Sequence, residues 1–150
     1  MTKQKITYKE LSEKLNKPVQ DFISKHAFWA FGETQLNEKL KELGITKEQL
    51  QKDYVSFFGG AIKKDKVQEY KRISNKATND LIEALKADFD LAKDAFNYEL
   101  NNHECFYTGR FSEALNAIGL TTKEVNENET LLKAFKEAKN DYWTWACENC

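Results

Sequence analysis

The chain contains an internal repeat of one helical pattern. Residues 36–50 (LNEKLKELGITKEQL) and 111–125 (FSEALNAIGLTTKEV) align without a gap, and every apolar residue of the first copy aligns with an apolar residue of the second. Three further aligned pairs are Gly44 with Gly119, Thr46 with Thr121, and Gln49 with Glu124. The glycine can take the left-handed conformation that ends a helix, and the threonine can cap the next helix in a box with the Gln or Glu. The repeat therefore predicts two helix-glycine-helix hairpins, with a positive φ at both glycines.

The content of proline and glycine favours a helical fold around this repeat. One proline and six glycines occur in 150 residues, which is few for a strand-rich fold with many turns. Ten Phe, six Tyr and three Trp supply more apolar surface than a disordered chain carries. The length is that of one domain. We expect a compact, mainly helical all-α domain over residues 1–150, with at most one small β-hairpin.

Capping residues and helical spacing predict the long helices. The first is expected over Tyr8–Ser24, because Thr7 and Glu10 can form a capping box, and Pro18 is expected to kink or divide it. Further helices are expected over Lys66–Lys86, over Leu91–Asn102 and from Asn128 onwards. The last helix carries an apolar stripe that we expect in the core: Leu131, Phe135, Ala138, Tyr142 and Trp145.

Two short apolar segments do not fit this helical pattern. AFWAF at residues 27–31 is too short for a helix and is more typical of a buried strand or an extended segment. FFGGAI at residues 57–62 places two glycines between apolar residues, which is typical of a turn or a small hairpin. We therefore expect a minor β element at residues 57–62 and leave the state of residues 27–31 open.

The charge of the chain is uneven along its length. Residues 1–76 carry 16 Lys and Arg against 10 Asp and Glu, whereas residues 77–150 carry 7 against 14. The two halves are therefore +6 and −7, although the whole chain is only −1. If the halves interleave in the fold, these charges cancel on the surface; otherwise one side of the molecule is basic and the other acidic.

No pattern of catalytic or metal-binding residues stands out in the sequence. It has no phosphate-binding glycine loop, no nucleophile elbow and no H-E-x-x-H. Glu99 and His103 share one helix face, but such a pair is more often a structural hydrogen bond than an acid–base pair. Cys147 and Cys150 would need His103 and Cys105 to complete a zinc site, and only the C-x-x-C half has the usual spacing. We expect a non-enzymatic protein with no metal and no cofactor.

The first residues of the chain bear on its location. MTKQKITYKELSEKL alternates charges with single apolar residues and contains no apolar run that could serve as a signal peptide or a membrane span. Three cysteines without regular spacing fit a reducing compartment. We expect a soluble cytoplasmic protein with no membrane partner.

Three blocks of the sequence resemble a family of small proteins of bacteriophages and mobile elements of gut bacteria. These blocks are AFWAFGETQLNEKLKELGIT at residues 27–46, the turn at Gly59 and Gly60, and YELNNHECFYTG leading into EALNAIGLT at residues 98–121. The resemblance implies an anti-CRISPR protein that inhibits a type II effector nuclease. It also implies a place of action in the cytoplasm of a bacterial host.

An inhibitor of such a nuclease could cover one of its positively charged nucleic-acid channels with an acidic surface. The second half of this chain supplies the acidic side chains, with a tyrosine beside them. The predicted partner-binding residues are Asp80, Glu83, Asp88, Asp90, Asp94, Glu99, Glu104 and Tyr107. If the acidic residues only solubilise the helices, the aromatic residues Phe28, Trp29, Phe31 and Tyr107 are the next candidates.

Two other kinds of function stay open at this point. A nucleic-acid-binding accessory protein could use the basic patch Lys63, Lys64, Lys66, Lys71, Arg72 and Lys76. The helix-glycine-helix units do not favour direct binding of nucleic acid, because their second helices carry as many acids as bases. A homodimeric structural module is the other alternative, and the sequence does not indicate the oligomeric state.

Overall fold

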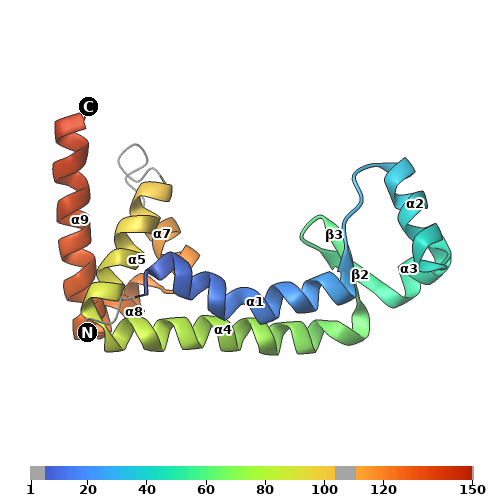
Figure 1. The fold of residues 1–150 in the computed structure, drawn as a ribbon, viewed down its shortest axis with the longest axis horizontal. Helices are drawn as coiled ribbons and strands as arrows, with labels where there is room; N and C mark the ends of the chain where they lie inside the picture. Colours follow the sequence, from blue (N-terminus) through green and yellow to red (C-terminus); the bar gives the residue numbers. More distant parts are fainter. Residues whose placement is uncertain (1–5, 104–110, 150) are drawn as a thin grey trace. The chain divides into compact units, whose positions relative to one another are not determined.

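The computed structural model describes residues 6–103 and 111–149 (Figure 1). These residues form a mainly α-helical fold with one small antiparallel sheet, as the sequence predicts. None of the helices in them is both long enough and apolar enough to cross a lipid bilayer. In chain order the elements are α1 (Tyr8–His26), β1 (Ala27–Phe28), α2 (Glu33–Leu43), α3 (Lys47–Asp53), β2 (Tyr54–Phe57), β3 (Gly60–Lys63), a 3-10 turn η1 (Lys64–Lys66), α4 (Val67–Ala87), α5 (Phe89–Asn102), α7 (Ser112–Ile118), α8 (Thr122–Glu127) and α9 (Glu129–Asn149).

The chain divides into two units. The helical unit consists of residues 1–15 and 77–150, and the mixed unit consists of residues 16–76. The helical unit carries 11 Lys and Arg against 16 Asp and Glu, and the mixed unit carries 12 against 8. Their formal charges are therefore −5 and +4. The uneven charge of the sequence is thus kept in the structure as a difference between the two units.

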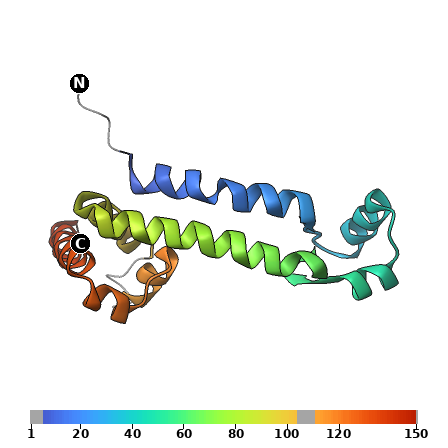
Figure 2. The same cartoon turned by 90° about the horizontal axis from the view of Figure 1, so that it is seen from below.

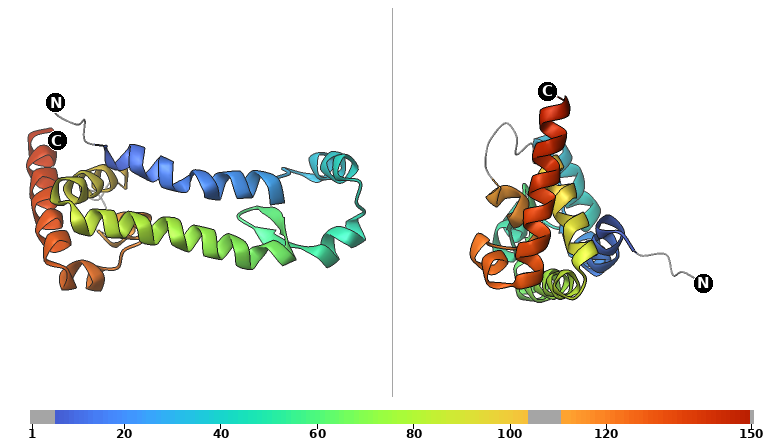
Figure 3. Two further views of the ribbon diagram at one scale, coloured as in Figure 1. Left: turned by 60° about the horizontal axis from the view of Figure 1, so that its bottom comes forward. Right: turned by 90° about the vertical axis from the view of Figure 1, so that its left-hand side faces the viewer.

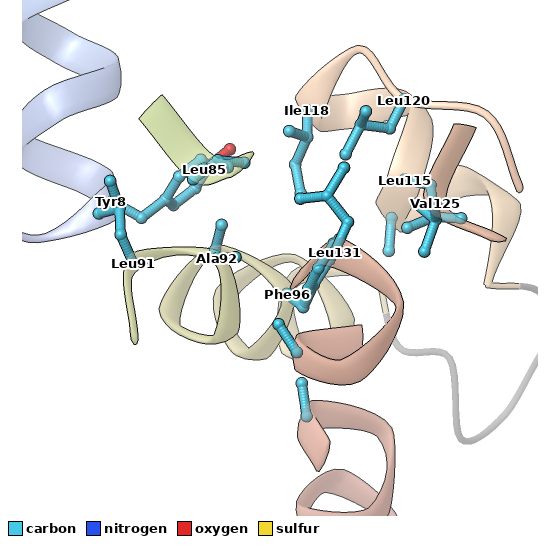
Figure 4. Packing of buried hydrophobic residues seen from close by; sticks show 14 of the residues in the cluster. Tyr8, Leu85, Leu91, Ala92, Phe96, Leu115, Ile118, Leu120, Val125 and Leu131 are labelled. Atoms are coloured by element: carbon cyan, nitrogen blue, oxygen red, sulfur yellow. The ribbon is translucent and has the colours of Figure 1, made fainter. Parts of the chain in front are cut away.

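The core of the helical unit is built where α5 and α9 lie side by side (Figure 3). Phe96 of α5 and Leu131 of α9 are 1% and 0% exposed and belong to one cluster of buried side chains. The short helices α7 and α8 add Leu115 and Val125 to the same cluster (Figure 4). Each such side chain contributes about 1.5–3 kcal/mol on full burial, so this cluster is the main source of stability in the unit.

The apolar stripe of α9 is buried, or half-buried at Phe135, except at its last member. The helix is capped as predicted, because Asn128 Oδ1 accepts a hydrogen bond from the Leu131 amide at 3.0 Å. Tyr142 is 5% exposed and is the last stripe residue in the core cluster. Trp145 is 55% exposed, so its prediction as a core residue is wrong. Its ring lies beyond the buried cluster and stacks on Tyr142 instead, with centroids 6.3 Å apart.

The other predicted helices are confirmed to within two residues at each end. In α1, Thr7 Oγ1 accepts a hydrogen bond from the Glu10 amide at 3.2 Å, which is one half of the predicted capping box. The helix is not divided at Pro18 and continues to His26 (Figure 2). A proline removes one backbone hydrogen bond, but Phe22 after it is buried. Packing of this later segment offsets the missing bond.

The mixed unit contains the three-stranded sheet, in the order β1-β3-β2 with both pairs antiparallel. FFGGAI forms the predicted hairpin between β2 and β3, and AFWAF begins as the short strand β1 and then leaves the sheet. The hairpin turn consists of Phe58 and Gly59, with φ angles of 46° and 84°. Two positive φ values are the signature of a type I′ turn, whose twist matches that of the strands.

Both copies of the repeat form the predicted hairpin. Gly44 ends α2 with a φ of 68°, and Gly119 ends α7 with a φ of 99°. The residue after each glycine donates its amide to a carbonyl five residues earlier, at 3.0 Å in the first copy and 2.9 Å in the second. Each threonine then caps the next helix in a complete capping box. The same local hydrogen bonds thus stop one helix and start the next in both units.

The two copies differ in how deeply their apolar residues are buried. Ile118 and Leu120 of the second copy are 2% and 1% exposed, because α7 and α8 pack on the core of the helical unit. Leu43, the counterpart of Ile118, is 48% exposed, and Ile45, the counterpart of Leu120, is half-buried. The local pattern therefore determines the hairpin but not its burial.

Candidate partner-binding surfaces

Three of the predicted acidic contacts lie on the surface of the helical unit. Asp80 and Glu83 are exposed on α4, and Asp90 is exposed in the first turn of α5. Glu83 Oε1 lies 3.6 Å from Lys86 Nζ. Such an exposed pair contributes little to stability, so this carboxylate is accessible to a partner.

Two other predicted contacts serve the fold of the helical unit. The Asp88 side chain caps α5 by accepting a hydrogen bond from the Leu91 amide at 3.2 Å. Asp94 Oδ2 accepts a hydrogen bond from the Tyr8 amide at 2.8 Å, at the first residue of α1. A carboxylate at a helix N-terminus satisfies an otherwise unpaired amide and interacts favourably with the helix dipole. These two carboxylates therefore have structural partners within the chain.

Glu99 is a correction to the predicted acidic surface, because it is buried. The residue is 5% exposed, and its Oε1 accepts a hydrogen bond from the Tyr8 hydroxyl at 2.7 Å. Its Oε2 lies 3.1 Å from His103 Nε2, which is the structural hydrogen bond expected for two residues on one helix face. Burial, and then the hydrogen bond and charge of Glu99, raise the pKa of the Tyr8 hydroxyl well above its ordinary value. Glu99 thus joins α1 to α5 and does not face a partner.

Several predicted residues lie outside the described part of the chain. These are the predicted partner contacts Glu104 and Tyr107, together with Cys105 and Cys150, two of the four residues that a zinc site would need. Cys147 is described and is a free, exposed thiol. Among residues 6–103 and 111–149, no group of three or more His, Cys, Asp or Glu side chains could hold a metal ion.

The mixed unit presents a second kind of surface, made of aromatic side chains at the hairpin turn. Phe58, in the turn itself, is 77% exposed. The indole Nε1 of Trp29 donates a hydrogen bond to the Phe58 carbonyl at 3.1 Å, which ties the segment after β1 to the turn. We call Trp29 and Phe58 the aromatic turn surface. Of the four aromatic candidates from the sequence, it contains Trp29, whereas Phe28 lies within the sheet and Phe31 is exposed in the segment between β1 and α2.

Phe58 was not among the residues predicted from the sequence to bind a partner. Its ring contacts Phe57 and Tyr70 edge-on, with centroids 4.7 Å and 6.5 Å away. The signal that could have identified it is the dipeptide Phe-Gly in a two-residue hairpin loop. A type I′ turn prefers Asn or Gly at both central positions, so a phenylalanine there goes against the local preference.

The basic residues considered for nucleic-acid binding also belong to the mixed unit. Lys63 ends β3, Lys64 and Lys66 lie in η1, and Lys71, Arg72 and Lys76 lie on α4. Lys66 Nζ lies 4.0 Å from Glu69 Oε2. On α4, Arg72 and Lys76 are one turn apart and share a helix face.

Comparison with known proteins gives one match. The sequence matches a family of unknown function (DUF7659) over residues 7–141. No curated protein and no solved structure matches the chain. The matched range covers more than half of the chain and includes both copies of the repeat, the sheet and the acidic residues of α4 and α5. The chain therefore belongs to this family of unknown function, DUF7659.

Proposed function

We propose that the protein acts without catalysis, by binding a protein partner through its aromatic turn surface. The observation that carries the proposal is Phe58, which is 77% exposed and has a φ of 46°. The left-handed conformation costs a residue other than glycine about 1–2 kcal/mol, and a ring this exposed regains little of that by burial. Strained backbone at an exposed position is typical of binding sites, and aromatic side chains often dominate protein–protein contacts.

For the identity of the partner, the resemblance to phage and mobile-element proteins supplies the proposal. A type II CRISPR nuclease in the cytoplasm of a bacterial host has basic channels for guide and target. The helical unit has a formal charge of −5, and Asp80, Glu83 and Asp90 are exposed on it. We propose that these three carboxylates speed association with such a basic surface, since complementary charges act mainly on association rate and salt sensitivity.

Phe58→Asn is expected to separate binding from stability. It removes the ring and gives the hairpin the Asn-Gly sequence that a type I′ turn prefers. We therefore expect an unfolding free energy equal to that of the wild type or about 0.5–1 kcal/mol higher, together with a loss of partner binding of tenfold or more. The measurements are urea denaturation followed by circular dichroism, and affinity capture from host lysate with the two proteins side by side.

Phe135→Leu, at a half-buried ring packed against the core of the helical unit, is the control that lowers stability without touching the turn. It should keep the captured partner. If Phe58→Asn captures the same partner in the same amount as the wild type, the aromatic turn surface is not the binding site.

Reversal of the exposed acidic residues tests the nuclease as partner. The triple variant Asp80→Lys, Glu83→Lys and Asp90→Lys leaves the helix caps and the buried Glu99 intact. In a cleavage assay with purified nuclease, guide and target DNA, we expect it to require about ten times more protein for half-inhibition than the wild type. The difference should shrink as salt is raised, because exposed charges are screened.

The matched control has the same change in net charge on the mixed unit: Asp21→Lys, Glu38→Lys and Glu48→Lys. It should inhibit like the wild type. A wild-type protein that leaves cleavage untouched would rule out this nuclease as the partner. If both triple variants inhibit as well as the wild type, the three acidic residues only keep the protein soluble.

A further inference from the structure

The three-stranded sheet of the mixed unit has one open face and one largely covered face, on which only the edge residue Val55 is exposed. Ile62 and Phe57 lie on the covered face, 0% and 8% exposed, and pack with Phe22. Side chains alternate along a strand, and cross-strand partners share a face. Ala61 and Lys63, the neighbours of Ile62 in β3, therefore lie on the other face together with their cross-strand partners. This open face carries Phe28, Tyr54, Ser56, Ala61 and Lys63, none of which is buried.

Two aromatic rings lie together on the open face. Phe28 from β1 and Tyr54 from β2 are on opposite sides of β3, and their ring centroids are 5.7 Å apart at an interplanar angle of 67°. Both side chains are half-buried, so part of each ring is accessible. Aromatic rings on an open sheet face are a common platform for stacking unpaired nucleic-acid bases.

A basic pocket adjoins this pair of rings. It has a volume of about 390 Å³ and is lined by Ile45, Lys52, Asp53, Tyr54, Lys63, Lys64 and Asp65. Within the described part of the chain, its three lysines form no ion pair with a carboxylate. With the two aspartates included, the lining carries a charge of +1, and the mixed unit as a whole carries +4.

From this arrangement we infer that the open sheet face binds single-stranded nucleic acid, an activity beyond the protein binding proposed above. Unpaired bases stack on Phe28 and Tyr54, and the phosphates that follow lie against the lysines of the adjoining pocket. A duplex does not fit this chemistry, because its bases are already stacked and paired. An acidic protein segment would use the lysines but has no need of paired rings, and for this reason we favour nucleic acid.

Fluorescence anisotropy with labelled ten-nucleotide strands of RNA and of DNA tests the inference on the full-length protein. We expect binding to at least one of the two strands, and the comparison shows whether the site accepts ribose, deoxyribose or both. Binding to the corresponding duplex should be at least tenfold weaker. For single strands, the logarithm of affinity falls with the logarithm of salt with a slope of about −0.7 per phosphate contact. Lys63→Glu with Lys64→Glu should therefore weaken binding at least tenfold and reduce the slope by about 1.4.

The aromatic pair is tested with Phe28→Leu and Tyr54→Leu, which keep apolar volume but remove the stacking surface. Each should weaken binding about fivefold or more, while circular dichroism shows that the fold is kept. If a leucine variant loses the fold, the test rests on the variant Lys63→Glu with Lys64→Glu, because both lysines are exposed and their substitution does not disturb the core. Phe58→Asn should bind the strands normally, so failure of the proposed protein binding and failure of this inference are distinguishable.

The control Lys71→Glu with Arg72→Glu makes the same charge change on α4, outside the pocket. It should retain binding within about twofold. Three outcomes would overturn the inference: no binding of either strand at 100 mM salt and about 100 µM protein, an equal loss in the α4 control, or displacement of the strands by poly-glutamate at the same concentration of charge.

Discussion

Tyr8→Phe is expected to lower the free energy of unfolding by about 1.5–3 kcal/mol at neutral pH. The change removes the hydroxyl that donates to Glu99 Oε1 at 2.7 Å and leaves a buried carboxylate with His103 as its remaining side-chain partner among the described residues. A hydrogen bond to a buried charged group is among the more valuable single contacts in a protein. Urea denaturation followed by circular dichroism measures the loss.

The same variant predicts a pH dependence. Burial and Glu99 raise the pKa of Tyr8 in the folded state, so the stability from this hydroxyl is fully present below the unfolded tyrosine pKa of about 10. It is lost as the pH rises above that value, because the unfolded chain then releases a proton that the folded chain keeps. The difference in stability between wild type and Tyr8→Phe should therefore shrink above pH of about 10, by about 1.4 kcal/mol per pH unit.

Tyr98→Phe is the matched control, because Tyr98 is 43% exposed and its ring lies 5.6 Å from that of Tyr8. Its effect should stay within about 0.5 kcal/mol at neutral pH. Parallel pH curves for the wild type and Tyr8→Phe would contradict the assignment of the buried hydrogen bond.

Gly119→Ala is expected to cost about 2–3 kcal/mol, and Gly44→Ala about 1 kcal/mol. Both glycines have a positive φ, so alanine meets backbone strain at each. At Gly119 the added Cβ would also lie 2.5 Å from Thr78 Cγ2, whereas at Gly44 no atom lies within 4 Å. The repeat thus supplies its own control, with the same local conformation and a different tertiary environment. Denaturant titration of the two variants gives the comparison.

A double-mutant cycle isolates the steric part of this effect. Thr78→Ser removes the methyl group that the new Cβ would meet. We expect it to recover about 1 kcal/mol in the Gly119→Ala background, a coupling typical of residues in contact, and to have no such effect with Gly44→Ala. Equal costs for the two alanine variants would show that the helix end, and not its packing, determines the loss.

Features that depend on a few neighbouring residues could be predicted from the sequence. The helix stops at Gly44 and Gly119, the caps after them and the hairpin at FFGGAI all rest on hydrogen bonds or φ angles within about five residues. The start of α1 at Tyr8 and the cap at Asn128 belong to the same class. The physics of such features acts within one or two turns of chain, so composition and spacing are sufficient to find them.

The candidate site depended much more on tertiary structure. Exposed charge was predicted for the acids of α4 and α5, but Glu99 is buried by a tyrosine 91 residues away in the chain, and Asp94 caps a helix that begins 86 residues earlier. Side-chain patterns within one helix carry no information about such distant partners. For the same reason the stripe of α9 predicted Trp145 as core, although the buried cluster ends at Tyr142.

The sequence by itself determined which segments are helices, where they stop and that one hairpin interrupts them, because these properties are local. Only the tertiary structure decided which faces are buried. It buried Ile118 and left its repeat counterpart Leu43 exposed, and it separated a unit of charge −5 from one of charge +4. It also left Phe58 at a surface turn and one sheet face open. Burial results from the packing of distant segments, which a local pattern permits but does not select.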